Sequence, residues 1–179
     1  MIVTGPPASG KSTLAARLAR DLSLPAITKD GIKEVLLDAI GAVDVESSRR
    51  VGRAAWTVFW QLVEVEAAAG RSVIVEGNIA RESGELQLTW LAERYDIRPL
   101  QVHCFAPIEV LYRRYEQRIG ERHPGHGDAD RLPALRPSLD PSLYRLLIHG
   151  ALISVDTSSF DDVDYESIRQ AVQVHLDTA

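Results

Sequence analysis

The nine residues from 5 to 13, Gly-Pro-Pro-Ala-Ser-Gly-Lys-Ser-Thr, have the types and the spacing to bind a chain of phosphates. They fit the pattern G-x-x-x-x-G-K-[ST], in which glycines let the backbone curl around an anion so that its N–H groups face the phosphates. Lysine at the seventh position neutralises the β- and γ-phosphates, and the following hydroxyl holds Mg²⁺. The motif predicts a site for ATP and Mg²⁺ formed by Gly5, Ala8, Ser9, Gly10, Lys11, Ser12 and Thr13.

Asp30 is the candidate general base. It follows a short apolar stretch and begins a helical one. A hydroxyl that accepts the γ-phosphoryl group must lose its proton, and a carboxylate within hydrogen-bond reach can take it. The alternative interpretation is that Asp30 caps the N-terminus of the helix that follows. The two roles are compatible.

With these motifs the chain resembles the P-loop kinases. The segment from 28 to 33 resembles the 5′-polynucleotide kinases and the related AAA_33 and zeta-toxin-like groups of predicted small-molecule kinases. In that group an Asp after the second strand is the general base, and a basic residue three positions later binds the acceptor. The resemblance gives these roles to Asp30 and Lys33. The family more often has arginine in place of Lys33, and lysine lacks the bidentate grip that suits a phosphate-terminated acceptor.

Glu76 ends the apolar run from 72 to 76 and looks like the second nucleotide-binding motif. There an acid organises the water shell of Mg²⁺ beside Ser12. Asp is the usual residue at this position of the motif. The longer Glu76 is therefore expected to reach the metal through water or to contact the acceptor instead. The alternative is that Glu76 is only a solvated acid at the end of a strand. Asn78 is a candidate to hydrogen-bond the acceptor.

The helical stretch from about 45 to 69 is expected to have two faces. We expect the core face to carry Val51, Ala55, Val58 and Leu62. The opposite side carries Arg49, Arg53, Trp56 and Trp60. Arginine and tryptophan together suit an acceptor wall, with Arg53 and Trp56 as its binding residues, and they equally suit a packing or dimer surface.

A helix expected after Pro107 carries arginines every four residues, at Arg114, Arg118 and Arg122. By the resemblance, Arg118 and Arg122 are catalytic lid arginines that reach the phosphates, and Arg118 also binds the nucleotide; a solvated basic edge is the alternative. The segment from 121 to 141 shows little periodicity and is expected to be a mobile loop. Its His and Asp residues fit no standard zinc spacing.

The loop after the fifth strand cups the adenine in this group of kinases, which places Asp156 and Thr157 near the base. The chain lacks the Asn-Lys-x-Asp element of guanine-binding switches, which weakly favours ATP over GTP.

Strand-like apolar runs alternate with helical ones, as in a parallel sheet covered on both faces. The expected strands are 1–4, 25–28, 72–76, 100–105 and 151–155. The expected helices are 14–22, 30–40, 45–69, 82–95, one after 107, and 165–176. The prediction is an α/β fold: one P-loop NTPase domain over 1–179, a three-layer α/β/α sandwich with a five-stranded parallel sheet and a mobile lid at about 107–141. Ligands of such sheets bind beyond the carboxyl ends of the strands, where the candidate residues lie.

Composition sets outer limits. The chain has 179 residues, 45% of them hydrophobic and 25% charged, as in globular domains of this size. The sequence opens on a strand, so no leader peptide is expected. Its single cysteine is expected to be a buried, unreactive thiol, and a lone cysteine favours a cytoplasmic location. A net charge of −5 disfavours a long polyanion.

These features predict an ATP:alcohol phosphotransferase, a kinase that moves the γ-phosphate of ATP to a hydroxyl of a small molecule or nucleoside. A 5′-hydroxyl polynucleotide kinase is the first alternative, disfavoured by the acidic charge. A nucleotide-dependent switch without an acceptor is the second. No membrane partner is expected, and the sequence fixes neither the acceptor nor the oligomeric state.

Overall fold

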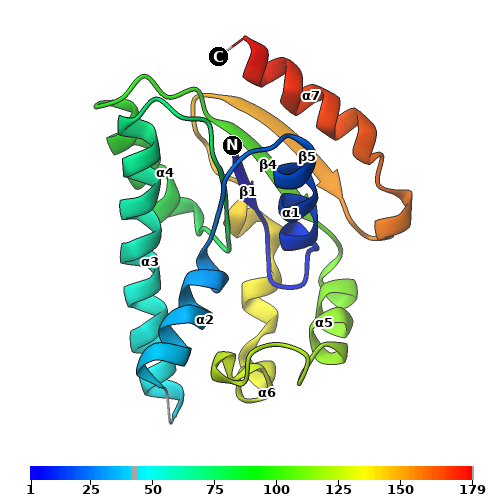
Figure 1. Cartoon of the computed structure of the whole chain (residues 1–179). Helices are drawn as coiled ribbons and strands as arrows, with labels where there is room; N and C mark the ends of the chain where they lie inside the picture. The colour runs from blue at the N-terminus through cyan, green and yellow to red at the C-terminus, as the bar shows by residue number, and fades with distance from the viewer. Residues whose placement is uncertain (42–43, 179) are drawn as a thin grey trace.

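A computed structural model describes residues 1–41 and 44–178, and it contains one five-stranded sheet (Figure 1). The strands are β1 (Ile2–Thr4), β2 (Ala26–Thr28), β3 (Ile74–Gly77), β4 (Leu100–Phe105) and β5 (Ala151–Asp156). Their spatial order is β2-β3-β1-β4-β5, and every neighbouring pair is parallel. The predicted parallel sheet is therefore confirmed, with strand ends within two residues of those expected.

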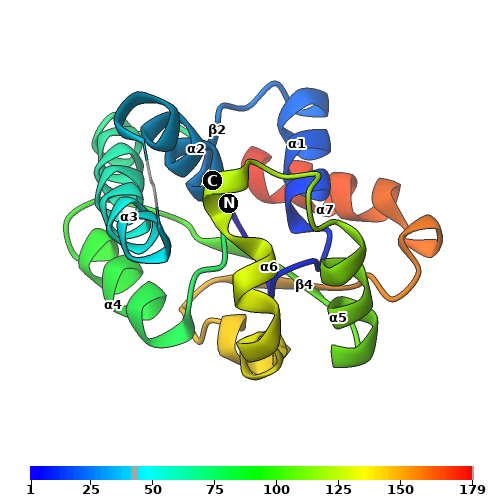
Figure 2. The same cartoon turned by 90° about the horizontal axis from the view of Figure 1, so that it is seen from below.

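Helices cover both faces of the sheet (Figure 2). The longer helices are α1 (Lys11–Asp21), α2 (Lys29–Ile40), α3 (Val45–Ala68), α4 (Arg81–Ala92), α5 (Ile108–Gln117) and α7 (Tyr165–Asp177). The loop expected from 121 to 141 is instead a series of short helical turns. They are η1 (Pro124–His126), α6 (Asp128–Arg131), η2 (Leu132–Ala134) and η3 (Arg136–Leu139), followed by η4 (Pro141–Tyr144). Single turns of this kind have no hydrophobic period, which is why the sequence pattern missed them.

Two hydrophobic clusters sandwich the sheet. On one face α1 and α7 pack on β1, β4 and β5 through residues such as Leu14, Leu18 and Val172. On the other face α3 and α4 pack on β1 and β3 through residues such as Phe59 and Leu88. Since both faces are covered, β1 and β3 are buried along their whole lengths, and β4 is buried along all but its last residue. The sheet is thus a rigid base for the loops at its carboxyl edge.

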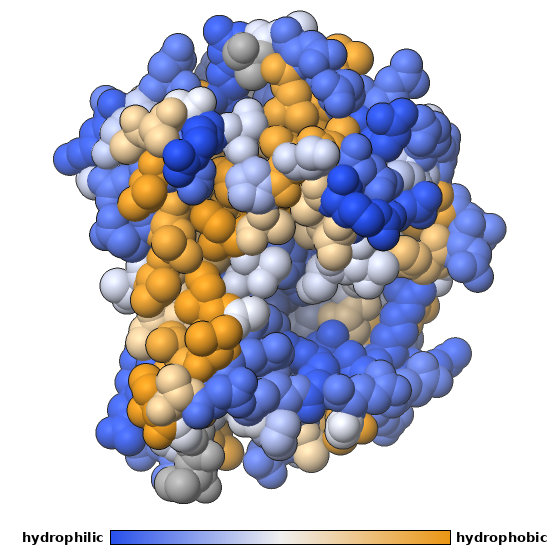
Figure 3. Space-filling view, viewed as in Figure 1, coloured by the Kyte–Doolittle hydropathy of each residue, from blue (hydrophilic) through white to orange (hydrophobic). Residues whose placement is uncertain are grey.

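The predicted core face of α3 is partly wrong. Val51 and Ala55 are buried, but Val58 and Leu62 are 39% and 41% exposed. Phe59 and Val63 take their places in the core. The aromatic ring decides the rotation of the helix because Phe59 buries more apolar area than the aliphatic residues it displaces. Apolar surface therefore remains along α2 and α3 in Figure 3.

The rotation also brings the two tryptophans of α3 toward the core rather than opposite it. Trp56 and Trp60 are half-buried and pack against the cluster of Phe59, with ring centroids 5.2 and 5.1 Å from the Phe59 ring. The expectation of a wholly non-core stripe is wrong for these two residues. Arg49 and Arg53 are exposed as expected.

Cys104 lies in the middle of β4 and is fully buried. Burial raises the pKa of its thiol to about 12, so the thiol stays protonated and unreactive, as the sequence predicted. Within the described ranges no helix has both the length and the apolar character needed to cross a membrane.

Candidate functional site

The loop from 5 to 10 wraps tightly between β1 and α1. A Cβ atom on Gly5 would lie 2.2 Å from the Cys104 carbonyl oxygen, so only glycine fits there. Gly10 has a φ of 75° and directly precedes α1, whose first N–H groups have no partner within the helix. Among the described residues the buried Ser9 hydroxyl has no hydrogen-bond partner either. Unpaired donors that converge at a helix N-terminus are what a phosphate chain binds.

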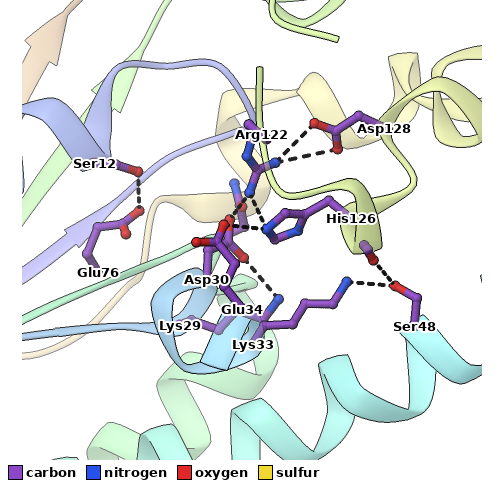
Figure 4. A network of polar contacts seen from close by, with 12 residues as sticks. Ser12, Lys29, Asp30, Lys33, Glu34, Ser48, Glu76, Arg122, His126 and Asp128 are labelled. Carbon is purple, nitrogen blue, oxygen red and sulfur yellow. Dashed lines mark hydrogen bonds and ion pairs between the residues drawn. The ribbon is translucent and has the colours of Figure 1, made fainter. Parts of the chain in front are cut away.

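Ser12 and Glu76 face each other at the carboxyl edge of the sheet (Figure 4), and Lys11 lies close to both. The Ser12 hydroxyl donates to Glu76 Oε1 at 3.1 Å, and Lys11 Nζ lies 3.9 Å from the same oxygen. Burial lowers the pKa of Lys11 and raises the pKa of Glu76. The charge of each residue acts against this effect of burial on the other. A hydroxyl beside a carboxylate is a donor set that suits Mg²⁺, so the residues fit the expected ATP and Mg²⁺.

Asp30 lies in the first turn of α2, where two cations contact it. Arg122 Nη2 lies 2.6 Å from Asp30 Oδ2, and Lys29 Nζ lies 3.1 Å from Asp30 Oδ1. Burial raises the pKa of Asp30, but the charges of Lys29 and Arg122 outweigh burial and hold it below its usual range. The N-cap of α2 is Thr28, so the alternative that Asp30 is the cap is wrong.

Lys33 is buried one turn further along α2. Its ammonium donates to the Ser48 hydroxyl at 2.9 Å, and that hydroxyl donates to the Gly125 carbonyl at 2.5 Å. The lysine thus joins α2 and α3 to the segment from 121 to 141. Burial, together with the nearby charge of Lys29, lowers the pKa of Lys33 to about 8.

This shift predicts how stability depends on pH. In the native state Lys33 loses its proton near pH 8, whereas in the unfolded chain it keeps the proton up to its ordinary pKa. Between about pH 8 and 10 the unfolded state therefore binds more protons than the native state. The native state gains stability as the pH rises through this range. The free energy of unfolding of the wild type, relative to Lys33→Met, should therefore increase by about 1–3 kcal/mol over this range. Urea unfolding at pH 7 and pH 10 measures it. A difference that shrinks with pH would contradict a depressed pKa.

Arg122 is the centre of a charged cluster between α2 and the segment after α5. Besides Asp30 it contacts Asp128, with Arg122 Nη1 3.3 Å from Asp128 Oδ2. His126 Nε2 lies 3.1 Å from Arg122 Nη2 and 2.7 Å from Glu34 Oε1. A neutral imidazole nitrogen either donates or accepts, so only one of these His126 contacts is a hydrogen bond in a given tautomer. The cluster thus holds Arg122, one of the two predicted lid arginines, against the candidate base Asp30.

Arg118 ends α5, and its guanidinium lies 4.8 Å from the centroid of the Tyr115 ring. Its buried Nε has no hydrogen-bond partner in the described part of the chain, and burial with the nearby charge of Arg122 lowers its pKa. A half-buried guanidinium with an unused donor is available for an anion. Arg114, one turn earlier, donates to the Ser158 carbonyl at 3.1 Å instead.

Three other predicted site residues have partners within the protein. Asn78 Nδ2 donates to the Gly5 carbonyl at 2.9 Å and so supports the phosphate loop. The Asp156 carboxylate accepts from the Ser158 N–H at 2.8 Å. The buried Thr157 hydroxyl donates to the Phe105 carbonyl at 3.0 Å. Each contact fixes a loop at the edge of the sheet, and the direct ligand roles stay predictions.

A cavity of about 560 Å³ opens beside this cluster, between α2, α3 and the turns from 124 to 131. Arg53 and Trp56 line it as predicted wall residues, together with Lys33, whereas Trp60 does not line it. A cavity of this size suits a small-molecule ligand. The structure thus brings Lys33, Arg53 and Trp56 to one cavity, which is also lined by Lys29, the ion-pair partner of Asp30.

Sequence reasoning missed four residues of the charged cluster: Lys29, Glu34, His126 and Asp128. Lys29 and Glu34 flank Asp30 and Lys33 on the same helix, so helical spacing was the signal available for them. His126 and Asp128 lie in single turns without periodicity, and only the folded chain brings them to Arg122. Phe160 was also missed; it lies so close to Gly10 that a Cβ atom there would be 2.5 Å from the Phe160 ring.

The parallel sheet, the phosphate loop and the charged cluster together define the fold of the P-loop kinases. The family model AAA_33, described as an AAA domain, matches residues 1–141, and the chain belongs to this family. No curated protein matches the sequence.

Solved structures agree with this assignment. A protein of Chloroflexus aurantiacus J-10-fl described as a "putative kinase" is 38% identical, with a TM-score of 0.88 over 97% of this chain and 96% of that one. A gluconokinase from Sinorhizobium meliloti 1021 is 18% identical, with a TM-score of 0.54 over 99% of this chain and 90% of that one. A shikimate kinase from Bacteroides thetaiotaomicron is 17% identical, with a TM-score of 0.56 over 98% and 97%. The last two share the fold alone.

Proposed function

We propose that the protein is an ATP-dependent phosphotransferase that moves the γ-phosphoryl group of ATP to a hydroxyl of a small molecule. The observation that carries the proposal is the position of Asp30. Its carboxylate pairs with Lys29, which lines the acceptor-side cavity, and is contacted by Arg122 at 2.6 Å, while Lys11 is close enough to act on its charge. The candidate base Asp30, Lys11 of the phosphate loop and the predicted lid residue Arg122 thus lie close together.

In this proposal the phosphate loop and Lys11 bind the ATP phosphates, and Ser12 with Glu76 holds Mg²⁺. ATP supplies the group that is transferred. Asp30 accepts the proton of the acceptor hydroxyl as that oxygen attacks. Arg118 and Arg122 offset the negative charge of the transferring group. The neighbours described as kinases of sugar acids and of shikimate are consistent with an alcohol acceptor.

Arg122 has two uses in this proposal. While it pairs with Asp30, the carboxylate is a poor base because its pKa is held low. A phosphate chain in the loop offers Arg122 a stronger anionic partner, and transfer of Arg122 to it would raise the pKa of Asp30. Base activation would then follow nucleotide binding. With a buried unreactive thiol at Cys104, we place the reaction in the cytoplasm.

A transfer assay tests the proposal. γ-³²P-labelled ATP and Mg²⁺ are incubated with the protein and pools of metabolites, nucleosides and oligonucleotides, and labelled products are identified by mass spectrometry. We expect label in a small hydroxyl compound. Steady ADP release without any acceptor, unchanged in Asp30→Asn, would indicate a nucleotide-dependent switch instead.

A further inference from the structure

The cavity beside Asp30 has a large excess of positive side chains. Its lining includes five cations, Lys29, Lys33, Arg49, Arg53 and Arg131, against two acids, Asp44 and Asp130. One of the acids is already used, because the Asp44 carboxylate accepts the Ser47 N–H at 2.7 Å as the N-cap of α3. The whole chain has the opposite balance, with 20 basic and 25 acidic residues. The local charge is therefore not a reflection of composition.

Most of these cations have no carboxylate partner. Lys29 pairs with Asp30, but no ion pair within the described ranges joins the other four, Lys33, Arg49, Arg53 and Arg131, to an acid. Elsewhere on the surface arginines find such partners, for example Arg71 with Glu66 at 2.7 Å. Like charges gathered on one cavity wall repel each other unless an anion lies between them.

Lys33 is the strongest evidence for a bound anion because its side chain is almost completely buried. The residue is 4% exposed, and its ammonium donates to the neutral Ser48 hydroxyl rather than to a carboxylate. Burying a charge without a charged partner is costly unless the site is completed by something else. An anion in the cavity would supply the missing charge and would raise the lowered pKa of Lys33.

From this charge pattern, and resting on the proposed phosphotransferase function, we infer that the acceptor is a small hydroxyl compound that carries its own phosphate or carboxylate group. Lys33, Arg49, Arg53 and Arg131 bind the anionic group while the hydroxyl reaches Asp30. The hydroxyl oxygen bonds to the γ-phosphorus, the bond from that phosphorus to the bridging oxygen of ADP breaks, and the hydroxyl proton passes to Asp30. The products are ADP, the phosphorylated anion and a proton.

Helical spacing places the two binding groups of the acceptor on one side of α2. Asp30 and Lys33 are three residues apart on one helix, so their Cβ atoms are about 5–6 Å apart. The candidate base and the buried cation therefore lie on the same side of α2. Lys33 replaces an expected arginine, but Arg49, Arg53 and Arg131 supply the planar guanidinium groups that bind phosphate and carboxylate in two-point contacts.

Phosphate binding to the nucleotide-loaded protein tests this inference. The phosphate loop is first filled with a non-hydrolysable ATP analogue and Mg²⁺, and inorganic phosphate is then titrated by calorimetry. We expect binding by the wild type, weakened at least tenfold in Arg53→Gln and in Arg49→Gln. Arg50→Gln is the matched control, because Arg50 is exposed on the same helix and does not line the cavity. Absence of phosphate binding, or equal affinity in all four proteins, would overturn the inference.

The same experiment separates this inference from the proposed function. Failure of the analogue to bind counts against the phosphotransferase, whereas the affinity difference between Arg53→Gln and Arg50→Gln still reports on the cavity. Matched acceptors then distinguish the anions: glycerol against glycerol 3-phosphate and glycerate, and glucose against glucose 6-phosphate and glucuronate. Faster transfer to a charged member supports the inference and shows which group is bound. Faster transfer to the neutral members, or transfer to a 5′-hydroxyl oligonucleotide alone, contradicts it.

Discussion

Lys11→Ala should lower kcat for phosphoryl transfer by at least about 10²–10³-fold, the range found when one preorganised charge or donor is removed from a reacting oxyanion. Lys11 is the cation of the phosphate loop, and in the part of the chain that the structure describes its Nζ has two polar partners, the Pro6 carbonyl at 3.3 Å and the Glu76 carboxylate at 3.9 Å. Without it the charge that develops on the β- and γ-phosphates is not neutralised. Initial rates of ADP formation with a saturating acceptor measure the effect.

The variant should remain folded. Burial lowers the pKa of Lys11, which means that the charged amine is disfavoured in the native state. Replacing Lys11 therefore removes the desolvation cost of the amine as well as its contacts with Pro6 and Glu76. Thermal unfolding of Lys11→Ala and of the more space-filling Lys11→Met checks this, and Arg20→Ala is the control for an exposed cation on the same helix. If either folded Lys11 variant keeps more than about a tenth of the wild-type kcat, a barrier change below ~1.4 kcal/mol, the phosphate-loop role is wrong.

The fold could be predicted almost completely from the sequence, because its signals are local. β1 and β3 come from short, mostly apolar runs and are buried along their whole lengths, as in strands covered on both faces. Glycines and prolines mark most of the boundaries between strands and helices. The phosphate loop is contiguous in the chain, so its geometry follows from nine residues. Two features were not predicted. The short helical turns within 121–141 have no hydrophobic period, and the rotation of α3 depends on how Phe59 fills the core against the sheet rather than on spacing along the helix.

The charged cluster could be predicted only in part. Asp30, Lys33, Glu76 and Arg122 were each found from a motif or a resemblance, yet none of their mutual contacts follows from the sequence. The pairing of Asp30 with Arg122 joins residues 92 positions apart, and it depends on single turns from 124 to 131 that place His126 and Asp128. The unpaired charge of the cavity was likewise invisible, because it is a property of three segments that meet only in the folded chain.

Asp30→Asn should retain ATP binding and lower kcat by about 10²–10⁴-fold, the usual range for loss of a general base. Asparagine keeps the size of the side chain but cannot take the proton of the acceptor hydroxyl. The contact with Arg122 is weakened at the same time, although Arg122 keeps Asp128 as a partner. The Asp30–Arg122 pair is partly exposed, with side chains 36% and 23% accessible, so its loss should cost only about 1 kcal/mol of stability.

A fluorescent ATP analogue, titrated into wild type and variant, separates binding from chemistry. Asp38→Asn is the matched control, since Asp38 lies on the same helix, is 74% exposed and, within the described ranges, forms an ion pair with His123 alone. In the free protein the pKa of Asp30 is held below its usual range, so the carboxylate is ionised across the neutral range. The wild-type kcat/KM, which reports the free enzyme, should therefore not fall with protonation of Asp30 until the pH is well into the acid range. Since Thr28 is the helix cap, a parallel loss of analogue binding and turnover in Asp30→Asn would mean that Asp30 matters for holding Arg122 and the lid segment in place. The proton would then have to go to Glu76, whose raised pKa and position beside Ser12 make it the next carboxylate within the site.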